Sequence, residues 1–174
     1  MGDSLITIVA VFLAAVLMFV FPLMAMSERA DDISQLSVQT ATTEFVNNVG
    51  STGKLTASDY EKFLETITST GNSFEVDIEI LILDENPGVK TTQAEMTKIG
   101  ENFFYTLYTS QVEERLNNNG RITLKEGDMI SVKVKNTNQT ISQTLKNFFY
   151  QLSGNDTYVI LGRDATSVKV NGSK

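Results

Sequence analysis

The sequence contains no cysteine, no histidine and no tryptophan. Without cysteine, the chain forms no disulfide and offers no thiolate to a metal ion. Without histidine, it lacks the usual zinc ligand and the usual general base, so Ser-His-Asp and Cys-His catalytic sets are excluded. We therefore expect a protein that is not an enzyme and that carries no metal and no other cofactor.

Basic residues are also scarce. The 14 lysines and arginines are outnumbered by 21 aspartates and glutamates, which gives a net charge of −7 and a pI near 4.6. A surface of this sign repels phosphate groups, so neither nucleic acid nor an anionic membrane surface is expected as the main partner. About 148 residues follow residue 26, enough for one domain of ordinary size.

A long apolar run does occur, from Leu5 to Met26, and it holds no charged side chain. As one helix rising about 1.5 Å per residue, it would cross roughly 30 Å of hydrocarbon. The Thr7 hydroxyl can bond to a carbonyl one turn earlier, whereas Pro22 removes a backbone donor and should bend the helix. We expect a membrane anchor with its N-terminus inside and the rest of the chain outside the cell.

A cleavable signal peptide is the alternative interpretation of this run. Such signals have a basic start, an apolar stretch of about 7–15 residues and small residues at the cleavage point. Here no basic residue precedes Arg29, and Met24-Ala25-Met26 is a poor cleavage site, but Pro22 just before it is typical of signals. The sequence therefore favours a retained anchor and leaves cleavage open.

The apolar run continues without a break into an amphipathic segment. Its apolar side chains recur at helical spacing: Ile33, Leu36, Ala41 and Phe45. We predict one long helix over residues 5–49, followed by a turn at residues 50–53. The chain then divides into an N-terminal transmembrane or assembly helix, residues 1–50, and an extracellular head domain, residues 51–174.

Three shorter helices are predicted in the head, each from a capping pair followed by an apolar face. The capping pairs are Thr56 with Asp59, Ser110 with Glu113, and Thr140 with Gln143. The corresponding apolar faces are Tyr60, Phe63, Leu64 and Ile67; Val112 and Leu116; and Ile141, Leu145, Phe148, Phe149 and Leu152. Glycines end these helices, at Gly71, Gly120 and Gly154.

Two segments, residues 74–83 and 128–135, alternate between apolar and polar side chains, as strands with one buried face do. The outward positions are acidic in the first strand and basic in the second: Glu75, Asp77 and Glu79 against Lys133 and Lys135. Because opposite charges on neighbouring strands attract each other, we predict that these two strands are adjacent and antiparallel.

The remaining segments are less regular. Residues 91–108 fit a helix or a strand, and residues 158–161 and 166–170 fit a strand pair or one bulged strand. Gly162-Arg163-Asp164 is expected to form a turn. The predicted fold class is α+β, with about three to four antiparallel strands covered by helices.

The other polar motifs suit structural roles better than chemical ones. The carboxylate pairs Glu75–Asp77 and Asp31–Asp32 are expected on solvated faces rather than in acid–base catalysis. Asp84-Glu85-Asn86 lacks the regular oxygen spacing of a calcium loop. Three glycosylation sequons occur, at Asn138, Asn155 and Asn171.

Two features of the first turns suit helix assembly. Asp3 precedes the apolar run, where a carboxylate stabilises a helix N-terminus and can pair with the terminal amine of a neighbouring chain. Small residues within the run would allow close helix packing: Ala10, Ala14, Ala15 and Ala25. The candidate assembly residues are Asp3, Thr7, Ala10, Ala14, Ala15 and Pro22.

The short leader, the charge-poor helix with a proline at position 22, the amphipathic continuation and the α+β head resemble type IV pilins and pseudopilins. The resemblance covers the layout of about the first 50 residues, and of the head only its class. That family is processed after a glycine and carries glutamate at the fifth mature position. Cleavage after Gly2 would place Thr7 there, and Asp3 could substitute for the missing glutamate in the ion pair that sets the register between subunits.

The resemblance implies a structural subunit of a cell-surface filament, a helical homopolymer that resides in the membrane before assembly. It also implies a prepilin-type peptidase and an assembly machinery as partners. The alternatives are a single-pass anchored ectodomain, serving as a binding or accessory protein of a secretion or conjugation apparatus, and a secreted protein released by signal cleavage.

Overall fold

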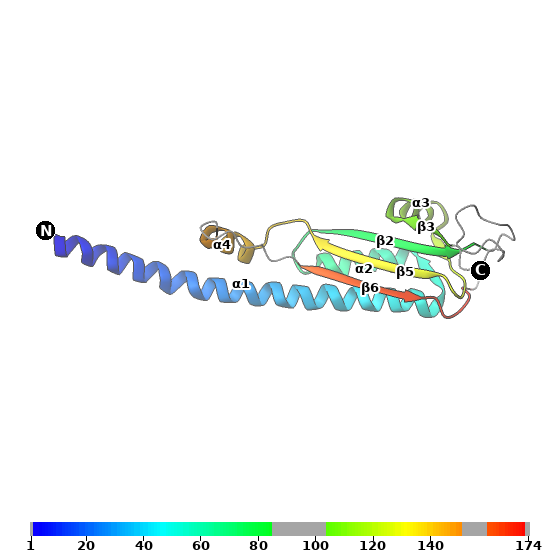
Figure 1. The fold of residues 1–174 in the computed structure, drawn as a ribbon, viewed down its shortest axis with the longest axis horizontal. Coiled ribbons are helices and arrows are strands. Elements are labelled where there is room, and N and C mark those ends of the chain that lie inside the picture. The colour runs from blue at the N-terminus through cyan, green and yellow to red at the C-terminus, as the bar shows by residue number, and fades with distance from the viewer. Residues whose placement is uncertain (1, 85–103, 151–159, 173–174) are drawn as a thin grey trace, which may run out of the picture.

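The computed structural model describes residues 2–84, 104–150 and 160–172, and of Phe149 and Tyr150 only the backbone. Figure 1 shows an elongated molecule in which one helix runs out of a small mixed head. This helix, α1 (Gly2–Thr52), passes through Pro22 without interruption and extends beyond the predicted bounds at both ends. The predicted turn at residues 50–53 is therefore wrong for its first three residues. Only Gly53, with a φ of 65°, leaves the helical conformation.

The head is an α+β unit with two antiparallel sheets, as predicted for its class. The larger sheet has the order β3-β2-β5-β6, formed by Phe104–Tyr108, Phe74–Leu83, Met129–Asn136 and Leu161–Ser167. The smaller sheet pairs β1 with β4, Lys54–Thr56 with Arg121–Thr123, and the sequence pattern did not predict it. The three shorter helices are α2 (Ala57–Thr68), α3 (Thr109–Asn119) and α4 (Ile141–Tyr150).

The predicted pairing of the two charged strands is confirmed. β2 and β5 are adjacent and antiparallel, and their register places Glu75 opposite Lys135 and Asp77 opposite Lys133. These charged side chains lie on the exposed face of the sheet. The buried face presents the apolar positions of the same strands, including Ile78, Ile80, Ile130, Val132 and Val134.

One apolar core joins this face of the sheet to the helices. Five of its members come from the second half of α1: Val38, Ala41, Phe45, Val46 and Val49. The Phe45 ring stacks on Phe63 of α2 with a centroid separation of 4.5 Å. The second half of α1 is therefore part of the head, as its amphipathic pattern predicted.

Two of the three predicted helix caps are confirmed. The Asp59 N–H donates to the Thr56 hydroxyl over 3.1 Å, and Thr140 and Gln143 exchange hydrogen bonds in a capping box. The Ser110–Glu113 cap is wrong, because the N-cap of α3 is Tyr108, two residues earlier. Glu113 instead accepts a hydrogen bond of 2.9 Å from the Tyr60 hydroxyl and ties α3 to α2.

The C-terminal strand corrects another prediction. Residues 162–164 form the middle of β6 rather than a turn. Gly162 permits this because a Cβ atom there would lie 2.7 Å from the Thr42 hydroxyl and 2.9 Å from a Val38 methyl. The glycine thus serves close packing of a strand on α1 rather than a change of chain direction. Of the segment predicted as helix or strand, residues 104–108 are a strand, and the rest lies outside the described residues.

Candidate functional site

Most of the large apolar side chains that are exposed among the described residues lie in the first half of α1. Every side chain from Gly2 to Phe19 is exposed, around the whole circumference of the helix. Within the apolar run, only Val20 and Met24 are half-buried. Among the described helices, α1 alone is long and apolar enough to cross a bilayer. A helix that is apolar all round needs lipid or other helices as its surroundings.

The six candidate assembly residues all lie in this exposed half of α1. The Thr7 hydroxyl donates to the carbonyl oxygen of Asp3 over 2.8 Å, the bond to the preceding turn that its helical position predicted. Their spacing places Asp3, Thr7, Ala10 and Ala14 on one stripe of the helix, since residues three and four apart share a face. Ala15 lies beside that stripe, and Pro22 follows two turns later.

This stripe joins a charged end to a run of small side chains. A neighbouring apolar helix could approach closely along Thr7, Ala10 and Ala14, because these side chains keep the two backbones little apart. The Asp3 carboxylate would then face the end of that neighbour. The arrangement suits helix–helix packing.

The second half of α1 is held in the head by polar contacts as well as by the core. Two glutamines one turn apart pair with the backbone of the edge strand β6. The Gln35 amide accepts from the Leu161 N–H over 2.7 Å and donates to the Leu161 carbonyl oxygen. The Gln39 amide does the same with Arg163, over 3.1 and 3.0 Å. The two side chains thus act as a substitute for the next strand and block the edge against pairing with another chain.

Sequence reasoning did not identify these glutamines. The available signal was a pair of amide side chains four residues apart on the helix, but their partners lie more than 120 residues away in the sequence. Such pairing depends on how closely α1 approaches β6, and Gly162 sets that approach.

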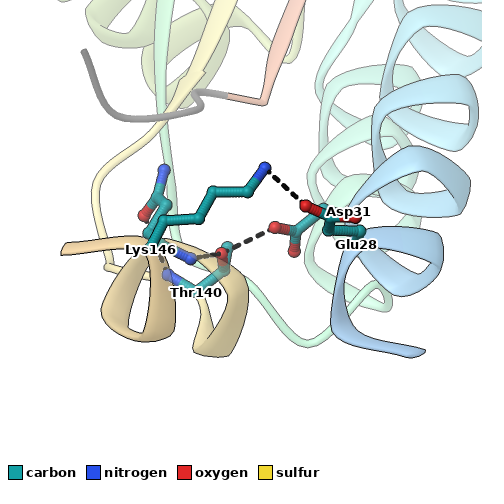
Figure 2. A network of polar contacts seen from close by, with 5 residues as sticks. Glu28, Asp31, Thr140 and Lys146 are labelled. Atoms are coloured by element: carbon teal, nitrogen blue, oxygen red, sulfur yellow. Dashed lines mark hydrogen bonds and ion pairs between the residues drawn. The ribbon is translucent and has the colours of Figure 1, made fainter. Parts of the chain in front are cut away.

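A second set of polar contacts attaches α4 to α1, just beyond the apolar run (Figure 2). The buried Thr140 hydroxyl donates to the Asp31 carboxylate over 2.7 Å, and the Lys146 ammonium lies 3.0 Å from the Glu28 carboxylate. The prediction that Asp31 lies on a solvated face is therefore wrong: its side chain is buried because α4 covers it, whereas Asp32 is exposed. The two carboxylates do not act as a pair.

Two of the three asparagines in glycosylation sequons take part in hydrogen bonds of the head. The Asn138 side chain accepts from the Ser73 N–H and donates to Asn72, and Asn171 accepts from the Glu126 N–H. Asn155, Glu85 and Asn86 lie outside the described residues. Within the described ranges, no group of three or more acidic residues is placed to hold a metal ion.

Comparisons of the chain with protein-family models, with curated proteins and with solved structures give no match. The structure itself shows a long N-terminal apolar helix joined to a small head with antiparallel sheets. This layout is consistent with a pilin-like arrangement.

Proposed function

We propose that this protein is a structural subunit of an extracellular filament resembling a type IV pilus, which polymerises through the first half of α1. The observation that carries the proposal is the continuity of α1. One unbroken helix is apolar on all sides for its first half and is part of the head's core in its second half.

This continuity makes the apolar half a rigid extension of the head. The core contacts of Val38, Phe45 and Val49 fix the direction in which the exposed half leaves the head. When many copies pack their apolar halves together, each head is therefore held at a defined angle and height. Transfer of the apolar side chains from lipid into a helix bundle, with close contacts along the Thr7–Ala14 stripe, would drive assembly.

In this arrangement, Asp3 sets the register between subunits by pairing with the terminal amine of a neighbouring chain. We expect Asp3→Ala to reduce the number and length of filaments seen by electron microscopy of the cell surface, without changing the unfolding of the head. Asp32→Ala is the matched control, since this exposed carboxylate lies on the same helix beyond the apolar run. Normal filaments from the Asp3 variant would rule out the register role.

The second candidate is a single-pass anchored ectodomain that serves as a binding or accessory protein. One observation favours it: Thr7 stands where pilins carry their glutamate, and its hydroxyl is bonded within its own helix. The two candidates differ when residues 5–26 are replaced by an unrelated apolar helix of equal length. An anchored ectodomain would keep its location and function, whereas a filament subunit would reach the membrane but form no fibres.

A further inference from the structure

Unlike α2 and α3, helix α4 buries polar residues and exposes two large apolar ones. In α2 the apolar residues Tyr60, Phe63 and Ile67 are buried. In α4 the polar residues Ser142 and Gln143 are buried, whereas Ile141 and Phe148 are 64% and 76% exposed. The prediction that the apolar face of α4 helps to cover the sheet is therefore wrong for these two residues. The Phe149 side chain and Leu152 lie outside the described part of the chain.

Its contacts with α1 place α4 beside the end of the apolar run. Thr140 at the start of α4 contacts Asp31, and Lys146, six residues later, contacts Glu28. Glu28 is two residues, or about 3 Å of helix, past Met26. Figure 1 shows that α4 runs toward the N-terminal end of α1. Phe148 follows Lys146 by two residues, so this direction carries it past Glu28 toward the end of the apolar run.

The burial of α1 agrees with this placement. Val20 and Met24 are the half-buried residues of the apolar run, and they share a helix face with Glu28, which contacts α4. The C-terminal end of α4 therefore lies beside the end of the α1 segment that would lie in a bilayer.

The composition of α4 also suits a membrane interface. In a chain with a net charge of −7, the ten residues of α4 contain no carboxylate, and their one cation, Lys146, is paired with Glu28. Interfacial helices place apolar and aromatic side chains at the boundary between head groups and acyl chains. Nothing in this arrangement requires anionic lipid, which agrees with the acidic balance of the whole chain.

We propose that α4 is a membrane-contact helix that runs alongside α1 at the outer boundary of the bilayer, so that Phe148 near its far end lies among the lipids and Ile141 at its start lies nearer the outer edge of the head groups, while α1 spans the bilayer. The helix then fixes the height and tilt of the head above the membrane. The inference requires that the apolar half of α1 resides in a bilayer, which both candidate functions share, and does not require that filaments form.

The absence of tryptophan provides a direct test. Single Phe148→Trp, Ile141→Trp and Tyr105→Trp variants of the full chain are reconstituted in phosphatidylcholine vesicles, with and without bromine on the acyl chains. Tyr105 is the control, since it is 46% exposed on β3, at the far end of the head. Far-UV circular dichroism and unfolding with urea verify that each variant folds as the unsubstituted chain does.

We expect brominated lipid to quench emission from position 148 most and from position 141 less, and to leave position 105 unchanged. Emission from position 148 should also shift to shorter wavelength in vesicles. Equal and negligible quenching at positions 148 and 105 would overturn the proposal without touching filament formation. If position 148 is unquenched in vesicles and shifts only when the protein self-associates, a second copy covers α4, and the lipid assignment is wrong.

Discussion

The two halves of α1 share one continuous helix and yet meet opposite surroundings. In the first half, Phe19 is 76% exposed, and in the second half, Phe45 is 6% exposed. The difference lies in the pattern of polar residues. The first half has none on any side between Thr7 and Pro22, whereas the second half alternates polar and apolar faces and so fits against a sheet. Helical conformation therefore does not distinguish the two halves; what covers them does.

The largest predicted effect tests that contrast with one side chain in each half. Phe45→Ala removes a ring stacked on Phe63 and leaves a cavity, which should lower the free energy of unfolding of the head by about 3–5 kcal/mol. Phe19→Ala, on the exposed half of the same helix, should change it by less than about 0.5 kcal/mol. Tyrosine fluorescence during urea unfolding in detergent measures both. Equal losses would show that the two halves are not energetically separate.

A smaller effect is expected where α1 touches β6 most closely. Gly162→Ala would place a methyl group 2.7 Å from the Thr42 hydroxyl, so we expect a loss of about 1–3 kcal/mol from overpacking. Adding Thr42→Ala should recover part of that loss, because it removes the nearest atom. A double variant no more stable than Gly162→Ala would place the strain elsewhere, for instance against Val38.

A third prediction concerns the glutamines that cover the edge of β6. Gln39→Glu keeps the acceptor for the Arg163 N–H but loses the donor to its carbonyl oxygen, whereas Gln39→Ala loses both. We expect the alanine variant to lose about 0.5–1.5 kcal/mol per hydrogen bond and to expose the Arg163 amide to hydrogen exchange. The glutamate variant should keep that amide protected. Exchange at Leu161, which Gln35 covers, is the internal control, and unchanged protection of Arg163 in the alanine variant would contradict this role.

The smallest effect is confined to alkaline solution and concerns Tyr60 of α2, whose ring lies 6.4 Å from that of Phe45 in the second half of α1. Burial raises the pKa of Tyr60 above its usual range, and the hydrogen bond to Glu113 adds to this. Above the ordinary tyrosine pKa of about 10, the unfolded chain loses a proton that the folded chain keeps, so stability falls as pH rises. Tyr60→Phe should flatten the fall in the free energy of unfolding between about pH 10 and about pH 12, because phenylalanine has no phenolic proton to lose. An unchanged slope would exclude Tyr60 as its source.

Local patterns predicted much of the head. The alternation and charges of β2 and β5 were sufficient to predict their bounds to within one residue, their adjacency and their antiparallel direction. The caps at Thr56 and Thr140 were equally readable, because a capping box is complete within four residues. The β1–β4 pair was missed because each of its strands has only three residues, too few to show a period.

The apolar half of α1 was predictable as well, because a long run of apolar residues without a charge is recognised within one contiguous segment. The contacts that orient the head on it were not. The predictions for Asp31 and for the apolar face of α4 were wrong because the polar side of α4 docks on α1, a contact between segments more than 100 residues apart.

The sequence by itself determined the long helix, the class of the head, the pairing of its charged strands and the exclusion of histidine and cysteine chemistry. Each of these follows from composition or from a pattern that is complete within one short segment, and the strand pairing follows from comparing the charges of two such segments. Only the tertiary structure decided that Gln35 and Gln39 cover the edge of β6, that Gly162 serves helix packing, and that α4 turns Ile141 and Phe148 outward beside the apolar run. These features join residues more than 100 positions apart, and their energies depend on how closely the elements approach one another.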